Sequence, residues 1–220
     1  MEINQLLSLL GKGILETLYM TVVSTAIAYV LGIPIGVLLY VTDEGGVLQN
    51  KAVNQVVGFV VNIVRSIPFL ILLVAILPFT RIVVGTTIGS TATIVPLVVA
   101  ASPFVARMVE SSLKEIDLGI IEAAHAMGSS PWQIITKVLL PEAKPSLLVG
   151  STIAITTILG YSAMAGFVGG GGLGAIATNY GYYRYQTDIM LITVLLLVVI
   201  VQIFQVVGMR FAGGTDKRKR

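Results

Sequence analysis

The sequence predicts an all-α integral membrane protein with five transmembrane helices and a polar helical segment between the third and the fourth. Of the 220 residues, 55% are hydrophobic and only 11% are charged, whereas a soluble domain carries about 25% charged residues. Five apolar stretches reach the roughly 20 residues that a helix needs to cross a bilayer. No internal repeat or linker interrupts the sequence, so residues 1–220 are expected to form a single transmembrane domain.

The first of these elements is preceded by a shorter amphipathic segment. Within residues 1–12, the apolar side chains of Ile3, Leu6, Leu7 and Leu10 fall on one helical face. This pattern predicts an interfacial N-terminal helix on the membrane surface, and a frayed terminus is the alternative. The spans themselves are expected at 14–41 (kinked at Pro34), 56–79, 88–111, 146–168 and 189–209.

The positions of lysines and arginines predict how the chain is oriented in the membrane. With the C-terminus in the cytoplasm, only Lys12, Arg81 and Arg184 of the 14 basic residues lie outside. Because basic loops stay in the cytoplasm, the N-terminus is expected outside. Residues 113–144 then form the long cytoplasmic loop. The basic tail, 210–220, is cytoplasmic and favours anionic membrane lipid.

The cytoplasmic loop carries signals for two helices joined by a sharp corner. Asp117 can cap a helix that begins at the next residue, and Gly128 occupies the position where a glycine ends a helix. Ser130 followed by Pro131 predicts a second helix start. This second helix is expected to run to about residue 140, where Pro141 interrupts it.

Small and apolar side chains share one face of the first loop helix. Ile120, Ala123, Ala124 and Met127 recur at helical spacing, beside the polar Glu122. Alanines allow another backbone to approach closely, so the strip can dock a cytoplasmic partner. The alternative is that it packs on the protein's own helix ends.

Several classes of function are excluded or disfavoured by composition. The chain has no cysteine and one histidine, which excludes disulfides, thiolate chemistry and a histidine-rich metal site. The phosphate-binding pattern G-x-x-x-x-G-K-[ST] is absent, and the glycine run at 169–174 follows a membrane helix rather than a strand. That run is expected to be a turn-forming outer loop. The net charge of +3 fits topology rather than nucleic-acid binding. We therefore expect no catalytic residue, metal or cofactor in this chain.

Two charged features within the apolar spans require an explanation. Arg65 can anchor the second span near its cytoplasmic edge, by snorkelling or by binding carbonyls that Pro68 frees; alternatively it belongs to a gate or pore. Arg107 and Glu110 are three residues apart and are expected to pair on one helix.

The loop sequence resembles the EAA loop of ABC-importer permease subunits. The matching residues are Glu122-Ala123-Ala124, Gly128, Val138 and Leu140-Pro141, with Val138 in place of the commoner isoleucine. The five-span plan and the segments RSIPF, ARMVE, GYSAMAG and GGGLG are similar to permeases of bacterial D-/L-methionine importers. This similarity covers essentially the whole chain.

The resemblance implies a type I importer permease in the bacterial inner membrane. It implies a homodimer with two cytoplasmic ATPase subunits, which hold ATP and magnesium, and an extracytoplasmic substrate-binding protein. The loop would be the coupling helix that contacts the ATPase. The residues implied in coupling are Glu122, Ala123, Ala124, Met127, Gly128 and Pro131.

The resemblance also implies a substrate path along the fourth span, which would use Tyr161, Ser162 and Met164; packing between helices is the alternative for these residues. The implied activity is inward transport of methionine by alternating access. The alternatives are another amino acid or small solute, an ion-gradient-driven transporter, and a membrane scaffold that recruits a soluble enzyme. An ion-driven transporter would usually require intramembrane acids and an inverted repeat, and the sequence indicates neither.

Overall fold

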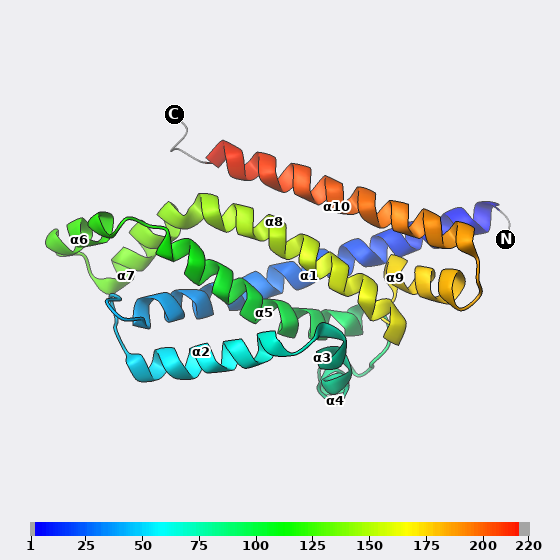
Figure 1. Cartoon of the computed structure of the whole chain (residues 1–220), viewed down its shortest axis with the longest axis horizontal. Helices are drawn as coiled ribbons and strands as arrows, with labels where there is room; N and C mark the ends of the chain where they lie inside the picture. The colour runs from blue at the N-terminus through cyan, green and yellow to red at the C-terminus, as the bar shows by residue number, and fades with distance from the viewer. Residues whose placement is uncertain (1–2, 216–220) are drawn as a thin grey trace.

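The structure, a computed structural model, describes residues 3–215, which form an elongated bundle of helices (Figure 1). The α-helices in chain order are α1 (Ile3–Thr42), α2 (Lys51–Ser66), α3 (Phe69–Ala75), α4 (Leu77–Val84), α5 (Ser90–Lys114), α6 (Leu118–Ala126), α7 (Pro131–Gln133), α8 (Leu140–Ala165), α9 (Gly172–Ile176) and α10 (Thr187–Thr215). Two π-helical stretches, η1 (Ile134–Leu139) and η3 (Ala177–Tyr182), and one 3-10 turn, η2 (Gly166–Val168), connect them.

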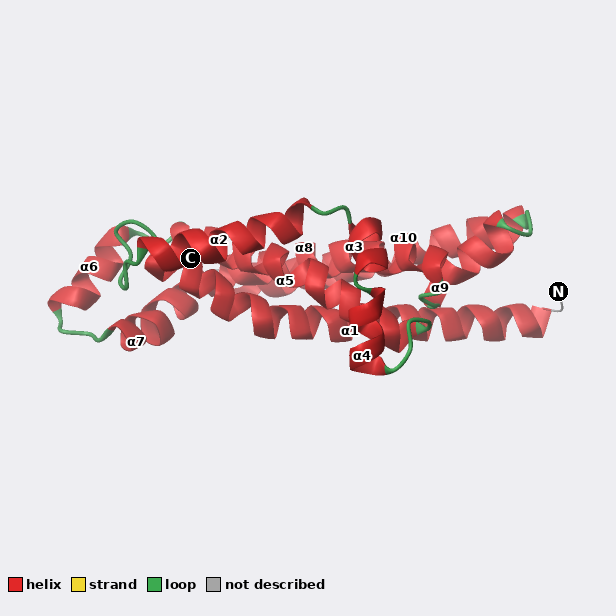
Figure 2. Cartoon of the chain, turned by 90° about the horizontal axis from the view of Figure 1, so that it is seen from below, coloured by secondary structure: helices red, strands yellow, loops and turns green. Residues whose placement is uncertain are grey.

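The bundle has two distinct ends. Helices α6 and α7 project at one of them, which we call the α6–α7 end, whereas α9 and the start of α1 lie toward the other, the α9 end (Figures 1 and 2). Helix α1 runs the length of the bundle, and α5 packs extensively along it. The all-helical architecture expected from the sequence is confirmed.

Within residues 3–215, four helical segments are long and apolar enough to cross a membrane: α1, α5, α10 and the stretch Pro131–Tyr182. A fifth span exists only if α2 and α3 are taken together, because their axes differ by 102°. The span expected over 56–79 is therefore not one continuous helix but is broken at Ile67 and Pro68. Pro68 has no N–H and forces the residue before it out of the helical region, and Ile67 is accordingly extended with φ −82° and ψ 124°.

The N-terminal residues do not form a separate helix. Residues 3–12 are the first turns of the 40-residue α1, so the boundary expected near residue 12 is absent. Leu10 is buried in a cluster with Leu173 and Ile176 of α9, which holds these turns against protein. Ile3 and Leu7 remain exposed. Residues 1–2, and residues 216–220 of the basic tail, lie outside the described part of the chain.

Two glycines allow α1 and α5 to approach closely. Gly32 and Gly36 are one helical turn apart and face Val105 and Val109 of α5. A Cβ atom on Gly32 would lie 2.6 Å from Val105 Cγ1, closer than such atoms can pack. Small residues at this spacing are a common device for packing membrane helices.

The segment after α8, expected to be a turn-forming loop, is mostly helical. The glycines at 169, 171 and 172 adopt positive φ values of 85°, 84° and 71°, a conformation that suits glycine. They lead directly into α9 and η3. Two α1 side chains hold this turn: Glu16 Oε2 accepts a hydrogen bond from the Gly172 N–H (2.8 Å), and Thr17 Oγ1 accepts one from the Leu173 N–H (2.9 Å).

Candidate functional site: the loop helices and the path beside the bent span

Helix α6 begins and ends where the sequence predicts. Asp117 is its N-cap, and Asp117 Oδ1 accepts a hydrogen bond of 2.7 Å from the Gly119 N–H. Beyond the last turn, Gly128 adopts φ +78°, and its N–H donates to the His125 carbonyl at 2.9 Å. Because few residues other than glycine accept this backbone conformation, Gly128 fixes the direction in which the chain leaves α6.

The second loop helix starts with a complete capping box. Ser130 Oγ accepts a hydrogen bond from the Gln133 N–H, and Gln133 Oε1 accepts one of 2.8 Å from the Ser130 N–H. Pro131 occupies the first helical position, where its missing N–H costs nothing. The corner between α6 and α7 is thus specified from both sides by local hydrogen bonds.

Pro141 does not end the second loop helix. Helix α7 passes through the π-helical stretch η1 straight into α8, so residues 131–165 form one continuous helical segment. In a π-helix the hydrogen bonds connect residues five apart, and the Leu140 N–H accordingly donates to the Ile135 carbonyl. The wider turn before Pro141 accommodates this proline, whereas a regular helix would lose a bond and clash.

The predicted docking strip of α6 divides between interior and surface. Ala124 is 3% exposed and belongs to the main core, together with Ile121. Met127 is 79% exposed, and Glu122 and Ala123 are exposed as well. One side of α6 therefore packs on the protein itself, and the other side is exposed.

The exposed surface of the loop helices extends beyond the residues selected from the sequence. Leu118 is exposed at the start of α6, and Trp132 in α7 is 72% exposed. Pro131, between the Ser130 cap and Trp132, is exposed too. Large apolar side chains at the tip of a projecting element indicate a contact surface. Trp132 could have been identified from the sequence, because it follows directly on the proline that begins the second loop helix.

The three path residues chosen on α8 lie in different environments. The Tyr161 ring is half-buried and stacks on Phe69 of α3, with centroids 4.5 Å apart and planes 5° apart. Ser162 is buried, and its hydroxyl donates to the Leu159 carbonyl at 2.8 Å. Met164 is exposed. Tyr161 and Met164 are therefore at least partly exposed, whereas Ser162 is buried within the chain.

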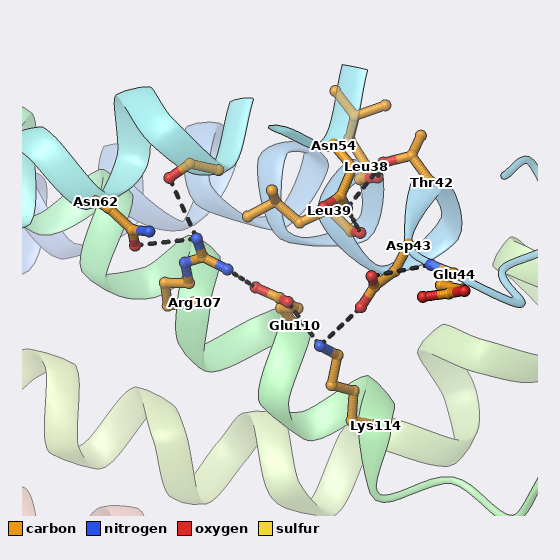
Figure 3. A network of polar contacts seen from close by, with 11 residues as sticks. Leu38, Leu39, Thr42, Asp43, Glu44, Asn54, Asn62, Arg107, Glu110 and Lys114 are labelled. Carbon is orange, nitrogen blue, oxygen red and sulfur yellow. Dashed lines mark hydrogen bonds and ion pairs between the residues drawn. The ribbon is translucent and has the colours of Figure 1, made fainter. Parts of the chain in front are cut away.

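A chain of charges holds α5 against the segment that joins α1 to α2 (Figure 3). Arg107 Nη1 and Glu110 Oε2 are 2.6 Å apart, which confirms the expected pair. Glu110 Oε1 also accepts from Lys114 Nζ at 2.9 Å, and Lys114 reaches Asp43 Oδ2 at 2.9 Å. The hydrogen bond from Lys114 holds the pKa of Asp43 below its usual range.

The same network reaches α2. Arg107 Nη2 donates to the Gly58 carbonyl at 3.2 Å and to Asn62 Oδ1 at 3.0 Å. Asn54 Nδ2 donates to the Leu39 carbonyl at 2.7 Å. These bonds tie α1, α2 and α5 together near the α6–α7 end, so the loop helices project from a stiff base.

Within residues 3–215, the Arg65 side chain makes none of the carbonyl contacts that one form of the anchoring interpretation expects. Arg65 lies in the last turn of α2, at the bend and away from the loop that precedes the helix. Its side chain is exposed, and none of the side-chain hydrogen bonds or ion pairs within residues 3–215 involves it.

The described part of the chain contains no cluster of three or more acidic or histidine side chains that could hold a metal ion.

Comparison with known proteins gives consistent matches along the chain. The family of binding-protein-dependent transport system inner membrane components matches residues 32–220. The protein named "Probable D-methionine transport system permease protein MetI" of Vibrio cholerae is 53% identical over 203 residues, covering 92% of this chain and 90% of the relative. The protein of the same name from Pasteurella multocida is 49% identical over 210 residues, covering 96% and 97%.

Solved structures show the same similarity in three dimensions. A chain of the MetNI methionine ABC transporter, in inward-facing conformations, matches with a TM-score of 0.96 and 50% sequence identity, covering 99% of this chain and 100% of the other. A chain of an amino acid ABC transporter crystallised with histidines matches with a TM-score of 0.79 at 20% identity, covering 96% and 95%. The second match concerns the fold alone.

Proposed function

Because this chain belongs to the family of binding-protein-dependent transport system inner membrane components, we propose that it is the permease subunit of an ATP-driven importer of methionine. The observation that carries this proposal is the high identity, over nearly the whole chain, to relatives named for D-methionine transport. The sequence resemblance to ABC-importer permeases is confirmed by the family and structural matches. The chain is thus a non-catalytic membrane subunit, which itself makes and breaks no covalent bond.

The proposed assembly is a homodimer of this chain with two ATPase subunits and one substrate-binding protein. The ATPase subunits, which bind ATP and magnesium, contact the α6–α7 end, and that end lies in the cytoplasm. The α9 end faces outward and meets the binding protein, so the N-terminus is outside and the C-terminus inside. The excess of basic residues toward the α6–α7 end supports this orientation.

The proposed coupling surface consists of the exposed loop-helix residues Glu122, Ala123, Met127 and Pro131, with Gly128 at the corner. Their exposure at a projecting tip supports the assignment. Ala124 acts from behind this surface, since its methyl group is buried within the chain. It contributes to coupling by holding α6 against the core of this chain, and it does not contact the ATPase.

The continuous helix from α7 to α8 supplies the mechanical link between this surface and the path. ATP binding would close the ATPase subunits and draw the two coupling surfaces of the dimer together. Since residues 131–165 are one helical segment, that motion would carry Tyr161 and Met164 with it and open the path outward. Hydrolysis would then reset the inward-open state, as rigid-body transitions of this kind require.

The decisive experiment is ATP-dependent uptake of labelled L-methionine into liposomes that hold this chain, its ATPase and its binding protein. Uptake that excess methionine abolishes, and other amino acids do not, is the expected result. Competition by a different amino acid or solute would keep the importer and replace its substrate. An intact complex that takes up nothing when supplied with ATP would favour the scaffold, and uptake driven by an ion gradient alone would favour a secondary transporter.

Docking can be tested separately from transport. Met127→Glu should weaken co-purification of the ATPase at least tenfold, because it places a charge on an exposed apolar contact. Ile88→Glu, the same type of change on an exposed residue near the α9 end, is the matched control and should leave association unchanged. Full ATPase binding by Met127→Glu would refute this coupling surface without affecting the proposed substrate.

A further inference from the structure

Helix α2 has two opposite faces, and Arg65 belongs to the one that faces the protein. Val56, Phe59, Val60 and Ile63 recur at i, i+3, i+4 and i+7, and all four are exposed, which makes this the lipid-facing side. A second set of residues has the same spacing but is shifted by two positions along the chain, which places it about 200° around the helix from the first set. That set consists of Gly58, Val61, Asn62 and Arg65.

The members of the second set other than Arg65 contact the rest of the bundle. Gly58 and Asn62 accept hydrogen bonds from Arg107 of α5, and Val61 is buried. Arg65 continues this side of the helix beyond the contact with α5, and there its side chain is exposed. Its guanidinium therefore projects away from the lipid-facing side, into space that no described residue of this chain fills.

Arg65 also lies deep in the membrane-spanning part. At about 1.5 Å per residue, it is roughly 14 Å along the axis from Val56, where the apolar part of α2 begins, and this is about half of a hydrocarbon core about 30 Å thick. An arginine is costly at such depth and normally has a partner there. Arg65 has no hydrogen-bond or ion-pair partner within residues 3–215, so an anion or acceptor that pairs with it has to come from outside these residues.

The bend after Arg65 leads into aromatic and apolar side chains that contact α8. The span breaks at Ile67 and Pro68 with a bend of 102°, and interrupted spans of this kind commonly form substrate sites in transporters. Four residues beyond Arg65, Phe69 stacks on Tyr161 of α8. Met164 lies one turn further along α8 and is exposed.

We propose that Arg65 binds the carboxylate of the amino acid in transit, while the stacked rings of Phe69 and Tyr161, with Met164, receive its apolar side chain. A guanidinium matches a carboxylate with two parallel hydrogen bonds, and sulfur contacts favourably with aromatic rings, so a thioether side chain suits the second half of this site. The inference rests on the proposed function, because it takes the carried solute to be an amino acid.

The first test measures uptake in the reconstituted complex with three variants. Arg65→Gln should lower methionine uptake at least tenfold, since a charge-assisted bond is lost, whereas Arg65→Lys should retain an intermediate rate. Arg81→Gln, on exposed α4, is the matched control and should transport normally. Stimulation of ATP hydrolysis by the binding protein should persist in Arg65→Gln, which shows that the complex has assembled.

The second test locates the solute directly, and its main result comes from the wild-type complex. Photo-methionine, a diazirine analogue with an intact carboxylate, is added to the wild-type complex without binding protein and photolysed. Cross-links are expected in peptides from 59–75 and 153–167, and they should be displaced by methionine but not by methioninamide. The same cross-links should be lost in Arg65→Gln.

The outcomes separate this inference from the proposed function. Wild-type protein that takes up no methionine would refute the proposed function. Normal uptake by wild type and by Arg65→Gln would refute only the carboxylate site. Cross-links elsewhere, or cross-links displaced equally by methioninamide, would also refute it and would assign Arg65 to a lipid phosphate or to the second copy of the chain.

Discussion

Gly36→Ala should destabilise the protein because it closes the narrowest approach between α1 and α5. A Cβ atom on Gly36 would collide with the Ala106 carbonyl and come within 2.6 Å of Val109 Cβ. Overpacking of this kind costs about 1–3 kcal/mol, and the upper part of that range applies because the carbonyl is backbone and cannot rotate away. Replacing glycine by alanine within a helix returns about 1 kcal/mol.

The net expected loss is about 2 kcal/mol, which corresponds to a fall in melting temperature of roughly 4–8 °C for a chain of this size. Thermal unfolding of the purified protein in detergent measures it. Gly11→Ala is the matched control on the same helix, because a Cβ atom there would meet nothing within 4 Å, and its melting temperature should stay the same or rise. Equal melting temperatures for the two variants would refute the α1–α5 distance on which the reasoning depends.

A double substitution sharpens this test. At Gly32 the two nearest obstacles are Cγ1 and Cβ of Val105, at 2.6 and 2.7 Å, so Gly32→Ala should cost less stability in a Val105→Gly background, which removes both atoms, than in the wild type. Gly36→Ala should cost as much in a Val109→Gly background as in the wild type, since the Ala106 carbonyl would remain in place. An equal reduction of the cost at both positions would show that side chains alone set the separation of α1 and α5.

The remaining predictions concern the corner and the charge network. Gly128→Val should raise the ATP consumed per methionine imported, because its φ of +78° disfavours a β-branched residue; an unchanged ratio in liposomes would contradict this. Arg107→Met should lower the free energy of unfolding by about 1–3 kcal/mol, because it removes the hydrogen bond to the Gly58 carbonyl and leaves the nearly buried Glu110 carboxylate without its arginine partner. Lys114→Met, at a half-exposed position, should cost less than about 1 kcal/mol, and chemical denaturation ranks the two. The lowered pKa of Asp43 stabilises the folded state above the unfolded value of about 3.9, and that contribution disappears as the pH falls through the lowered pKa. The melting temperature should therefore fall less steeply between about pH 5 and pH 3 in Asp43→Asn than in the wild type; parallel curves would remove Asp43 from the network.

Features set by neighbouring residues could be predicted from the sequence. The Asp117 cap, the positive φ of Gly128 and the Ser130–Pro131 start are each determined within a few residues, and the structure contains all three. The Arg107–Glu110 pair is local in the same sense. These interactions need no knowledge of the rest of the fold, because their partners lie within one helical turn.

Features that depend on distant segments could not be predicted in this way. Periodicity placed Ala124 and Met127 on one strip, but only the packing of α6 on the core decides that Ala124 is buried and Met127 exposed. Ser162 follows the same logic, because its orientation is set by helices far away in the sequence. The positions of Pro68 and Pro141 are evident from the sequence, but their effects are not. Pro68 bends a span, whereas a π-helical turn accommodates Pro141 within a continuous helix.

The π-helical stretch η1 has a geometric consequence for the whole chain. A π turn accommodates one residue more than a regular turn, and each residue of an α-helix advances the direction of its side chain by about 100°. Residues 134–139 therefore set the angular phase between the surface that carries Met127 and the side of α8 that carries Met164. Inserting or deleting a single residue there would turn one of these surfaces through about a quarter of a circle relative to the other, while leaving the composition of both intact.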